Sequence, residues 1–298
     1  MKNAINYYYN LFPDDIHQKD KKFLFNIDGI NYVFMQFDSD IRRLERIKYI
    51  ISILDYNHVV YNQIIKNNVN DIITYISNTP YILIKVSIDN QNNIIISDII
   101  DFQKYMSNIL NEKVDLASLS HLWMDKVDYF EYQISQFGIN FPIIRHSFNY
   151  FIGLAENAIM VLNNILKEEI VGTISHVRVS INKKIADLYN PLNFIVDSKV
   201  RDISEYLKEK MFFYDISSEF SYYFSFKYFS NEEIILFLAR ILYPTYYFDI
   251  CEKSIETNNE EYLKLIISKI SLYEKNLKYI YNYLKNRYQI PEIEWLST

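Results

Sequence analysis

Scarcity of glycine is the feature that most constrains this chain: only 4 of its 298 residues are glycine, whereas average composition would give about 20. Loops that hold phosphate groups through backbone amides need several residues that reach positive φ or let a ligand approach the backbone closely. Neither G-x-G-x-x-G nor G-x-x-x-x-G-K-S/T occurs. The shortage therefore excludes P-loop and dinucleotide-binding sites.

Composition and charge narrow the class of protein further. Half of the residues are hydrophobic and 23% are charged, which predicts a folded core rather than disorder. The net charge of −6 and the pI near 5.5, with basic residues scattered among acids, predict that the chain binds no nucleic acid. We attribute the excess of 28 Tyr and 20 Phe mainly to AT-rich codons.

Cysteine usage and apolar runs indicate a compartment. The single cysteine, Cys251, excludes an internal disulfide and a cysteine-based zinc site. Residues 1–20 lack the basic start, apolar stretch and cleavage site of a signal peptide. The longest apolar run, from Ile234 to Tyr243, is about half a membrane span and contains Arg240. We therefore expect a soluble cytoplasmic protein with no membrane partner.

The N-terminal residues have the patterns of a small sheet. Residues 23–37 predict a β-hairpin, because apolar positions alternate on both sides of a two-residue Asp28-Gly29 turn. A helix is expected to follow from an N-cap at Ser39. Two apolar runs, 72–76 and 81–88, then predict a further strand pair.

The remaining residues have mainly helical patterns. Apolar stripes run from Leu119 to Phe137 and from Ile144 to Leu166, and helical spacing resumes at residues 200–211. Between them, residues 172–179 and 193–197 are expected to be short extended pieces.

Two capping boxes mark later helix starts, because a Ser or Thr hydroxyl and a Glu three residues later can each cap the other's backbone amide. Ser230 and Glu233 are expected to start an apolar helix, and Thr257 and Glu260 a long final helix. The predicted fold class is α+β, with a β-rich N-terminal lobe at residues 1–88 that carries one helix and a larger helical lobe at residues 89–298.

Few residues are grouped for chemistry. The five histidines are dispersed without a second ligand at metal spacing, so no metal site is predicted. The most informative segment follows His176, where an extended piece ends in Asp197 and a helix opens with Arg201, Asp202 and Glu205. This pattern places Asp197 and Asp202 near a helix N-terminus; alternatively, the acidic residues only complement the helix dipole.

Five short segments carry a family resemblance: Tyr81-Ile-Leu-Ile-Lys85-Val, Ile152-Gly153-Leu-Ala-Glu156-Asn157-Ala158, Ser175-His176-Val-Arg178, Val196-Asp197-Ser-Lys-Val-Arg201-Asp202-Ile-Ser-Glu205-Tyr and Ile290-Pro291-Glu-Ile-Glu-Trp295-Leu. With them the chain resembles the bacterial spore-coat proteins of the kinase-like fold, relatives of the aminoglycoside and choline phosphotransferases. The resemblance implies a two-lobed protein-kinase-like fold and a role in coat assembly in an endospore-forming bacterium. The residue bias is compatible with low-GC, Firmicutes-like bacteria.

The same resemblance implies that the nucleotide-binding residues are degenerate. A working kinase needs a glycine loop over the nucleotide, and the hairpin offers only Gly29. Met35 stands where the family has a strand lysine for the phosphates, so Glu45 on the first helix has no lysine to pair with.

The catalytic loop is altered as well. Aligned on His176, Arg178 replaces the aspartate that accepts the substrate proton, and Lys183 replaces the asparagine. A guanidinium cannot act as a general base at neutral pH. Asp197 is retained at the position of the metal-binding aspartate. We hypothesise that Arg178 forms an internal ion pair with Asp197, where metal and phosphate would otherwise lie.

The preferred interpretation is a catalytically inactive kinase-like protein, a pseudokinase, with a structural or interaction role, no cofactor, and protein partners that include spore-coat components. One alternative is an active small-molecule phosphotransferase that uses Mg-ATP, with Asp187 or Asp202 as the catalytic carboxylate. The other is an unrelated α+β ligand-binding protein.

Overall fold

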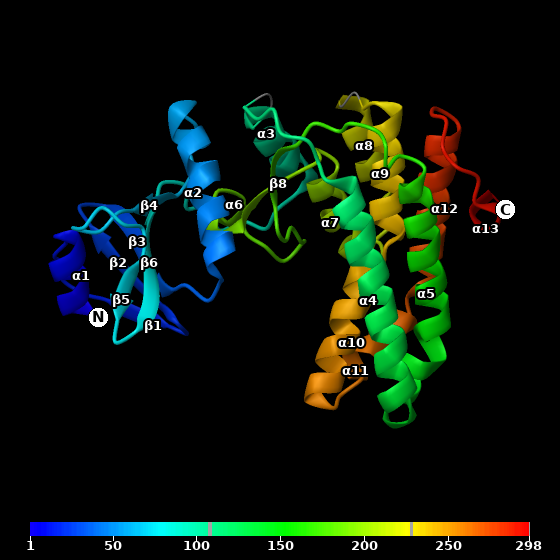
Figure 1. Cartoon of the computed structure of the whole chain (residues 1–298), viewed down its shortest axis with the longest axis horizontal. Helices are drawn as coiled ribbons and strands as arrows, with labels where there is room; N and C mark the ends of the chain where they lie inside the picture. The colour runs from blue at the N-terminus through cyan, green and yellow to red at the C-terminus, as the bar shows by residue number, and fades with distance from the viewer. Residues whose placement is uncertain (107–108, 227–228, 298) are drawn as a thin grey trace. The chain divides into compact units, whose positions relative to one another are not determined.

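A computed structural model describes residues 1–106, 109–226 and 229–297 (Figure 1). The chain divides into two compact units. Unit 1 consists of residues Met1–Asn93, Tyr105–Ile109 and Lys183–Ile195, and unit 2 of Ile94–Lys104, Leu110–Asn182 and Val196–Thr298. A folding-domain boundary after residue 88 stays a prediction.

Unit 1 is built on a six-stranded antiparallel sheet in the order β1-β2-β3-β6-β4, with β5 also paired to β6 (Figure 1). Its strands are β1 (His17–Lys19), β2 (Lys22–Ile27), β3 (Ile30–Gln36), β4 (Gln63–Ile65), β5 (Thr74–Ile76) and β6 (Thr79–Val86). This sheet confirms the β-rich N-terminal region. The three-residue strands β1 and β4 escape prediction because they are too short to leave an alternating pattern.

The predicted hairpin is formed by β2 and β3. Asp28 (φ 50°) and Gly29 (φ 80°) both have positive φ, as a two-residue type I′ turn requires. The pairing continues without a bulge from Ile27–Ile30 to Lys22–Met35. The turn therefore fixes which β3 residue lies opposite each β2 residue.

Two helices cover the two faces of the sheet. On one face, α2 (Ile41–Tyr56) packs Leu44 and Ile47 against Ile82 and Ile84 of β6. On the other face, Ile5 of α1 (Lys2–Tyr9) packs against Phe25, Phe34 and Leu83. The expectation of one helix in this region was therefore incomplete, since α1 has too few turns for a clear periodic pattern.

Helix α2 begins one residue later than expected. The N-cap is Asp40 rather than Ser39, and its carboxylate accepts a hydrogen bond from the Arg43 amide at 2.8 Å. A carboxylate at this position also complements the positive end of the helix dipole.

Unit 2 is mainly helical, and α5 packs against both α4 and α9 (Figure 1). Its helices are α3 (Ile96–Tyr105), α4 (Leu116–Phe137), α5 (Pro142–Asn163), α7 (Arg201–Lys210), α8 (Ser217–Phe226), α9 (Asn231–Leu242), α10 (Thr245–Thr257), α11 (Glu261–Ile267), α12 (Ile270–Lys285) and α13 (Glu294–Ser297). The 3-10 turn η1 (Gly138–Asn140) follows α4. The short elements that complete the fold are β7 (Thr173–His176), α6 (Ile185–Leu188), η2 (Pro191–Asn193) and β8 (Phe194–Asp197), and β8 pairs with β7.

One of the two expected capping boxes forms. Ser230 and Glu233 cap each other's backbone amides at the start of α9, as predicted. The box at Thr257 is wrong, because Thr257 ends α10 and Asn258 (φ 49°) is its left-handed C-cap. The carboxylate of Glu260 instead accepts hydrogen bonds from the amides of Ile143 and Ile144 at 3.3 and 2.8 Å, and so caps α5.

Residues Asn231–Thr257 form the one stretch, within the described part of the chain, that is long and apolar enough to cross a membrane. Its most apolar window is 83% buried inside the structure. That burial is typical of a core helix pair, here α9 and α10, rather than of a lipid-facing helix.

Candidate functional site

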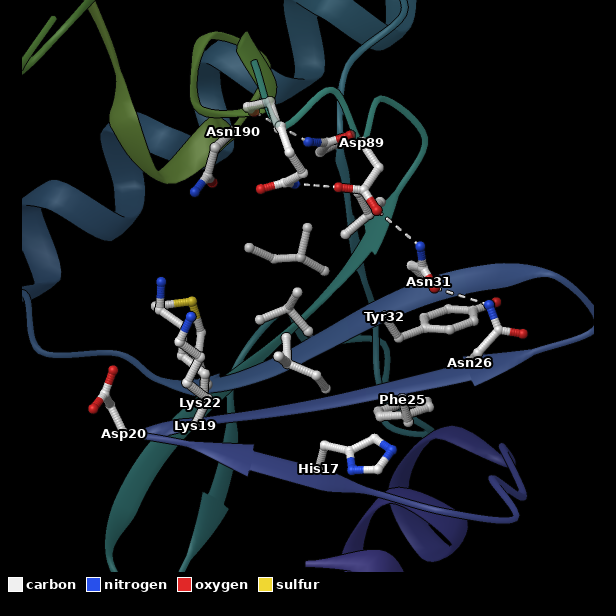
Figure 2. Close-up of a pocket in the computed structure, with 18 of the residues that line it drawn as sticks. His17, Lys19, Asp20, Lys22, Phe25, Asn26, Asn31, Tyr32, Asp89 and Asn190 are labelled. Atoms are coloured by element: carbon white, nitrogen blue, oxygen red, sulfur yellow. Dashed lines mark hydrogen bonds between the residues drawn. The ribbon is translucent and has the colours of Figure 1, made fainter. Parts of the chain in front are cut away.

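One face of the unit 1 sheet forms the floor of a cavity of ≈ 760 Å³ (Figure 2). Directly opposed residues of an antiparallel pair project from the same face, so the floor consists of rows that run across the strands. The rows are Lys19, Lys22 and Met35; His17, Leu24, Val33 and Ile84; and Asn26, Asn31 and Val86. The cavity floor therefore changes from cationic through apolar to amide-bearing.

The two ends of the cavity differ in chemistry (Figure 2). Lys19 and Lys22 lie at one end, close to the turn at Asp20. At the other end, Asn31 Nδ2 donates to Asp89 Oδ2 at 2.9 Å, and Asn26 Nδ2 donates to Asn31 Oδ1 at 2.8 Å. Asn190, from the segment after α6, also faces the cavity.

The predicted nucleotide-site residues of unit 1 lie in different places. Met35 is in the first row, directly opposite Lys22. Gly29 is not among the residues that line the cavity, and the turn that borders it has Asp20 (φ 53°) in place of a glycine. Glu45 is on α2, where it forms a largely exposed ion pair with Lys48 at 3.1 Å.

In unit 2, hydrogen bonds between His176 and Asp202 connect the end of β7 to α7. Both side chains are fully buried. Asp202 Oδ1 accepts a hydrogen bond from the His176 amide at 3.0 Å, and its Oδ2 lies 2.9 Å from His176 Nδ1. The Arg201 Nε–H donates to the His176 carbonyl at 2.8 Å. The sequence predicted only that Asp197 and Asp202 lie near one another at a helix N-terminus, so the contacts of His176 with Asp202 and Arg201 come from the structure.

Asp197 lies at the end of β8 between two guanidinium groups. Arg201 Nη1 is 2.9 Å from its Oδ2, and Arg240 Nη2 of α9 is 2.5 Å from its Oδ1. The Ser198 amide also donates to Oδ1 at 2.6 Å. Burial by itself would raise the pKa of Asp197, but the two arginines hold it below its usual value. Both carboxylate oxygens are therefore engaged by cations of the chain.

The hypothesis that Arg178 pairs with Asp197 is wrong. Arg178 forms its ion pair with Asp249 of α10 at 2.5 Å, and half of its side chain (52%) is exposed. The charge that balances Asp197 comes from Arg201 and Arg240, which α7 and α9 bring to it from later in the sequence. Lys183, at the asparagine position, is exposed.

The two carboxylates proposed for an active enzyme are both engaged in the fold. Asp187 accepts a hydrogen bond from the Lys184 amide at 2.8 Å at the start of α6. Asp202 is bound to His176 on both of its oxygens. Neither is a free base in this arrangement.

The arrangement around Asp197 does not fit a magnesium ion. Mg²⁺ needs carboxylate oxygens with free lone pairs in a nearly octahedral arrangement, whereas both Asp197 oxygens accept hydrogen bonds from arginine. Among the described residues, no three His, Cys, Asp or Glu side chains are grouped to hold a metal. Ion pairs and hydrogen bonds of Asp197 and Asp202 thus connect β7, β8, α7 and α9.

The fold defines the class of protein. The structure of an aminoglycoside phosphotransferase from Alicyclobacillus acidocaldarius subsp. acidocaldarius DSM 446 aligns with a TM-score of 0.66 at 9% identity, covering 96% of each chain. An AMP-bound spectinomycin phosphotransferase, APH(9)-Ia, aligns with a TM-score of 0.60 at 10% identity, covering 94% of this chain and 96% of that one. The amicoumacin kinase hAmiN aligns with a TM-score of 0.58 at 9% identity and 92% coverage of each. The chain thus has the kinase-like fold of the aminoglycoside phosphotransferases.

The family is shown by sequence. The family described as "Spore coat putative kinase YutH" matches residues 2–286, and the chain belongs to it. No curated protein sequence matches the chain. Family membership confirms the resemblance drawn from the sequence segments and overturns the alternative of an unrelated α+β ligand-binding protein.

Sequence reasoning missed three site residues: Lys22, Arg240 and Asp249. The position of Lys22 was predictable from sequence, because the Asp28-Gly29 turn alone predicts that Lys22 lies opposite Met35. Arg240 gave one signal, because it is the one charged residue in the apolar run from Ile234 to Tyr243. Asp249 gave none, since its ion pair joins residues of separate elements.

Proposed function

We propose that this chain is a spore-coat protein of the kinase-like fold that does not transfer phosphate and acts by binding other coat proteins. The observation that carries the proposal is that Arg201 and Arg240 each form an ion pair with one carboxylate oxygen of Asp197. A metal ion would have to displace two guanidinium groups, one of which, Arg240, is only 2% exposed.

Arg178, which stands at the position of the family's catalytic base, supports the same proposal. Arg178 cannot accept a proton, and its ion pair with Asp249 raises the pKa of its guanidinium further. General-base catalysis is typically worth about 10²- to 10⁴-fold in rate. Loss of the base and loss of the metal ligand act on the same transition state, so their effects on phosphoryl transfer combine.

The coat role rests on family membership. We propose that the chain acts at the coat without a cofactor, and that its partners there are proteins, not nucleic acids or membranes. The net charge of −6 gives no general attraction for nucleic acid.

The test has an enzymatic arm. Purified full-length chain is incubated with γ-labelled ATP, Mg²⁺ or Mn²⁺, and a set of aminoglycosides, beside an Asp197→Asn variant and an Asp249→Asn variant. We expect phosphate release and transfer at the level of the buffer for all three. Turnover by the wild-type chain that co-elutes with it in gel filtration would overturn the proposal, and its loss in the Asp197→Asn variant alone would identify a working metal site.

The second arm follows the protein in the endospore-forming host that carries the gene. An epitope-tagged chain is expected in the detergent-extractable coat fraction of purified spores, with a spore-core enzyme as the negative marker. Recovery of the tag only with that core marker would contradict the coat role.

A further inference from the structure

A groove runs between α4 and α5, which lie side by side in unit 2 (Figure 1). It has a volume of ≈ 530 Å³ and shares no residue with the cavity of unit 1. Its floor is apolar, with Met124 and Val127 from α4 and Ile159 and Met160 from α5. Almost half of Met160 (48%) is exposed, so this apolar floor is open to solvent.

The groove is formed by helices that other contacts already hold in place. Trp123 of α4 stacks on Tyr243, the C-cap of α9, with ring centroids 4.3 Å apart. The other helix, α5, packs against α9 and α11. At one end of the groove, Ser120 Oγ donates a hydrogen bond to Asn163 Oδ1 at 3.0 Å and so joins α4 to α5. The groove is therefore preformed, and a partner that enters it does not pay for its formation.

The two walls of the groove are acidic. Asp128 of α4 and Glu156 of α5 line it, and both residues are exposed. Within the described part of the chain, neither carboxylate forms an ion pair, and no lysine or arginine lines the groove. Lys126, the only lysine of α4, pairs with Glu252 of α10 instead. An apolar floor thus lies between two negative charges that the chain itself does not balance.

The shape of the groove favours a helix as its occupant. Two helices present no unpaired strand edge, so an extended segment would gain no backbone hydrogen bonds there, whereas a helix satisfies its own backbone. The α5 wall extends from Glu156 to Asn163, a rise of about 10 Å. This length fits two turns of a partner helix, whose apolar side chains would pack into the groove. Met124 and Met160 can adapt to such side chains, because methionine is unbranched and flexible.

The charge of the walls restricts the partner further. Lysine or arginine on both sides of an apolar stripe would complement Asp128 and Glu156. A second copy of this chain has a net charge of −6, so general repulsion disfavours it as the occupant.

We propose that the groove between α4 and α5 is the docking site for a basic amphipathic helix of another coat protein. Apolar side chains of that helix contact Met124 and Met160, and its lysine or arginine residues lie beside Asp128 and Glu156. This inference rests on the proposed protein-binding role at the coat, and it assigns that role a surface and a partner chemistry.

The first test uses a fluorescein-labelled peptide of about 18 residues, long enough to form a helix, with a leucine stripe between lysines. Its affinity for the full chain is measured by fluorescence anisotropy. We expect Met160→Glu to bind it at least tenfold more weakly, because a carboxylate then lies in the apolar floor. Leu265→Glu should bind within about twofold of the wild type. This control is matched, because Leu265 is 44% exposed and lies in the last turn of α11, as Met160 does in α5.

Two results of this titration would overturn the proposal. One is equal affinity of the Met160→Glu and Leu265→Glu variants. The other is equal binding of a peptide that has the same residues in scrambled order, since the leucine stripe would then contribute nothing.

A charge reversal tests the walls of the groove. The variant with Asp128→Lys and Glu156→Lys is expected to bind the basic peptide at least tenfold more weakly, and to prefer a peptide with glutamate in place of lysine. The control carries Glu256→Lys and Glu261→Lys, at exposed positions of α10 and α11, and changes the net charge equally. At physiological salt it should alter neither affinity by more than about threefold, because distant charges are screened. Equal effects of the two pairs would assign the attraction to net charge and overturn the groove as the site.

The final test is made in the endospore-forming host. Epitope-tagged Met160→Glu is expected to fall at least fivefold in the coat fraction relative to the wild type, whereas Leu265→Glu should stay at the wild-type level. Equal recovery of all three would overturn this inference and leave the coat role standing. Absence of the wild type from the coat would overturn the proposed function, and the coat partner with it. A wild-type dimer in gel filtration that Met160→Glu dissociates would make a second copy the occupant, and would also overturn the inference.

Discussion

At Asp197, two guanidinium groups meet one carboxylate in the interior of unit 2. Arg240 is buried, and its Nη2 lies 2.5 Å from Asp197 Oδ1. Burial holds the pKa of Arg240 below its usual value, although the charges of Asp197 and Glu205 act to raise it. A buried charge of this kind is tolerated only while its partner remains, so the pair fixes one arrangement of β8, α7 and α9.

Replacement of Arg240 should therefore destabilise the fold. Arg240→Met is expected to lower the free energy of unfolding by about 3 to 5 kcal/mol, because Asp197 keeps its charge in a buried site with only Arg201 to balance it. Urea denaturation measures the change.

The matched control for Arg240 is Arg178→Met. Arg178 also pairs with an aspartate, Asp249, but half of its side chain is in water. Removal of an exposed ion pair costs about 1 kcal/mol or less. Equal losses in the two variants would contradict the assignment of Arg240 as the buried partner of Asp197.

At the scale of elements, β8 is held in place by a close approach at the start of β7. A Cβ atom added to Gly172 would lie 2.8 Å from Val196 Cγ1 and 3.1 Å from the Glu112 carbonyl oxygen. The Gly172 amide donates to that same oxygen at 2.6 Å, so the backbone cannot move away easily. This contact sets the position of Asp197, one residue beyond Val196.

Gly172→Ala should therefore destabilise unit 2 by about 1 to 3 kcal/mol through overpacking. Gly153→Ala is the matched control, because Gly153 lies within α5 and a Cβ there would meet nothing within 4 Å. Replacement of a glycine by alanine within a helix is expected to raise the free energy of unfolding by up to about 1 kcal/mol. Thermal denaturation of both variants checks the contrast, and equal midpoints would show that the approach at Gly172 relaxes freely.

At the scale of the whole molecule, the charge network of unit 2 links stability to pH. Burial alone would raise the pKa of Glu205, but Lys208, Arg201 and Arg240 lower it to about 2. The pKa of Asp197 is lowered as well. Both carboxylates bind protons more readily in the unfolded chain, so their contribution is present in full above the unfolded pKa and is lost as pH falls.

We therefore expect the free energy of unfolding to be nearly constant from neutral pH to about pH 5 and to fall progressively toward pH 2. Glu205→Gln should flatten this slope, whereas Glu131→Gln, at an exposed position of α4, should leave it unchanged. Urea titrations at a series of pH values measure it. A slope that Glu205→Gln does not alter would contradict the role of this network.

Much of the secondary structure could be predicted, because the signals are local. The Asp28-Gly29 turn, the Ser230 capping box and the helical spacing of α4, α5 and α7 each depend on residues within one or two turns of each other. The failed box at Thr257 has the same local pattern, but the carboxylate of Glu260 caps α5 instead. A capping motif predicts a helix start only when no distant donor competes for its acid.

The sequence alone determined the fold class and the family segments, since these depend on residue type and local order. Tertiary structure decided which charges meet: Asp197 binds Arg240, 43 residues away, and Arg178 binds Asp249. Ion-pair partners are chosen by the packing of helices, which no spacing rule encodes. Strand pairing likewise decided that Lys22 lies directly opposite Met35 on the cavity face of the sheet.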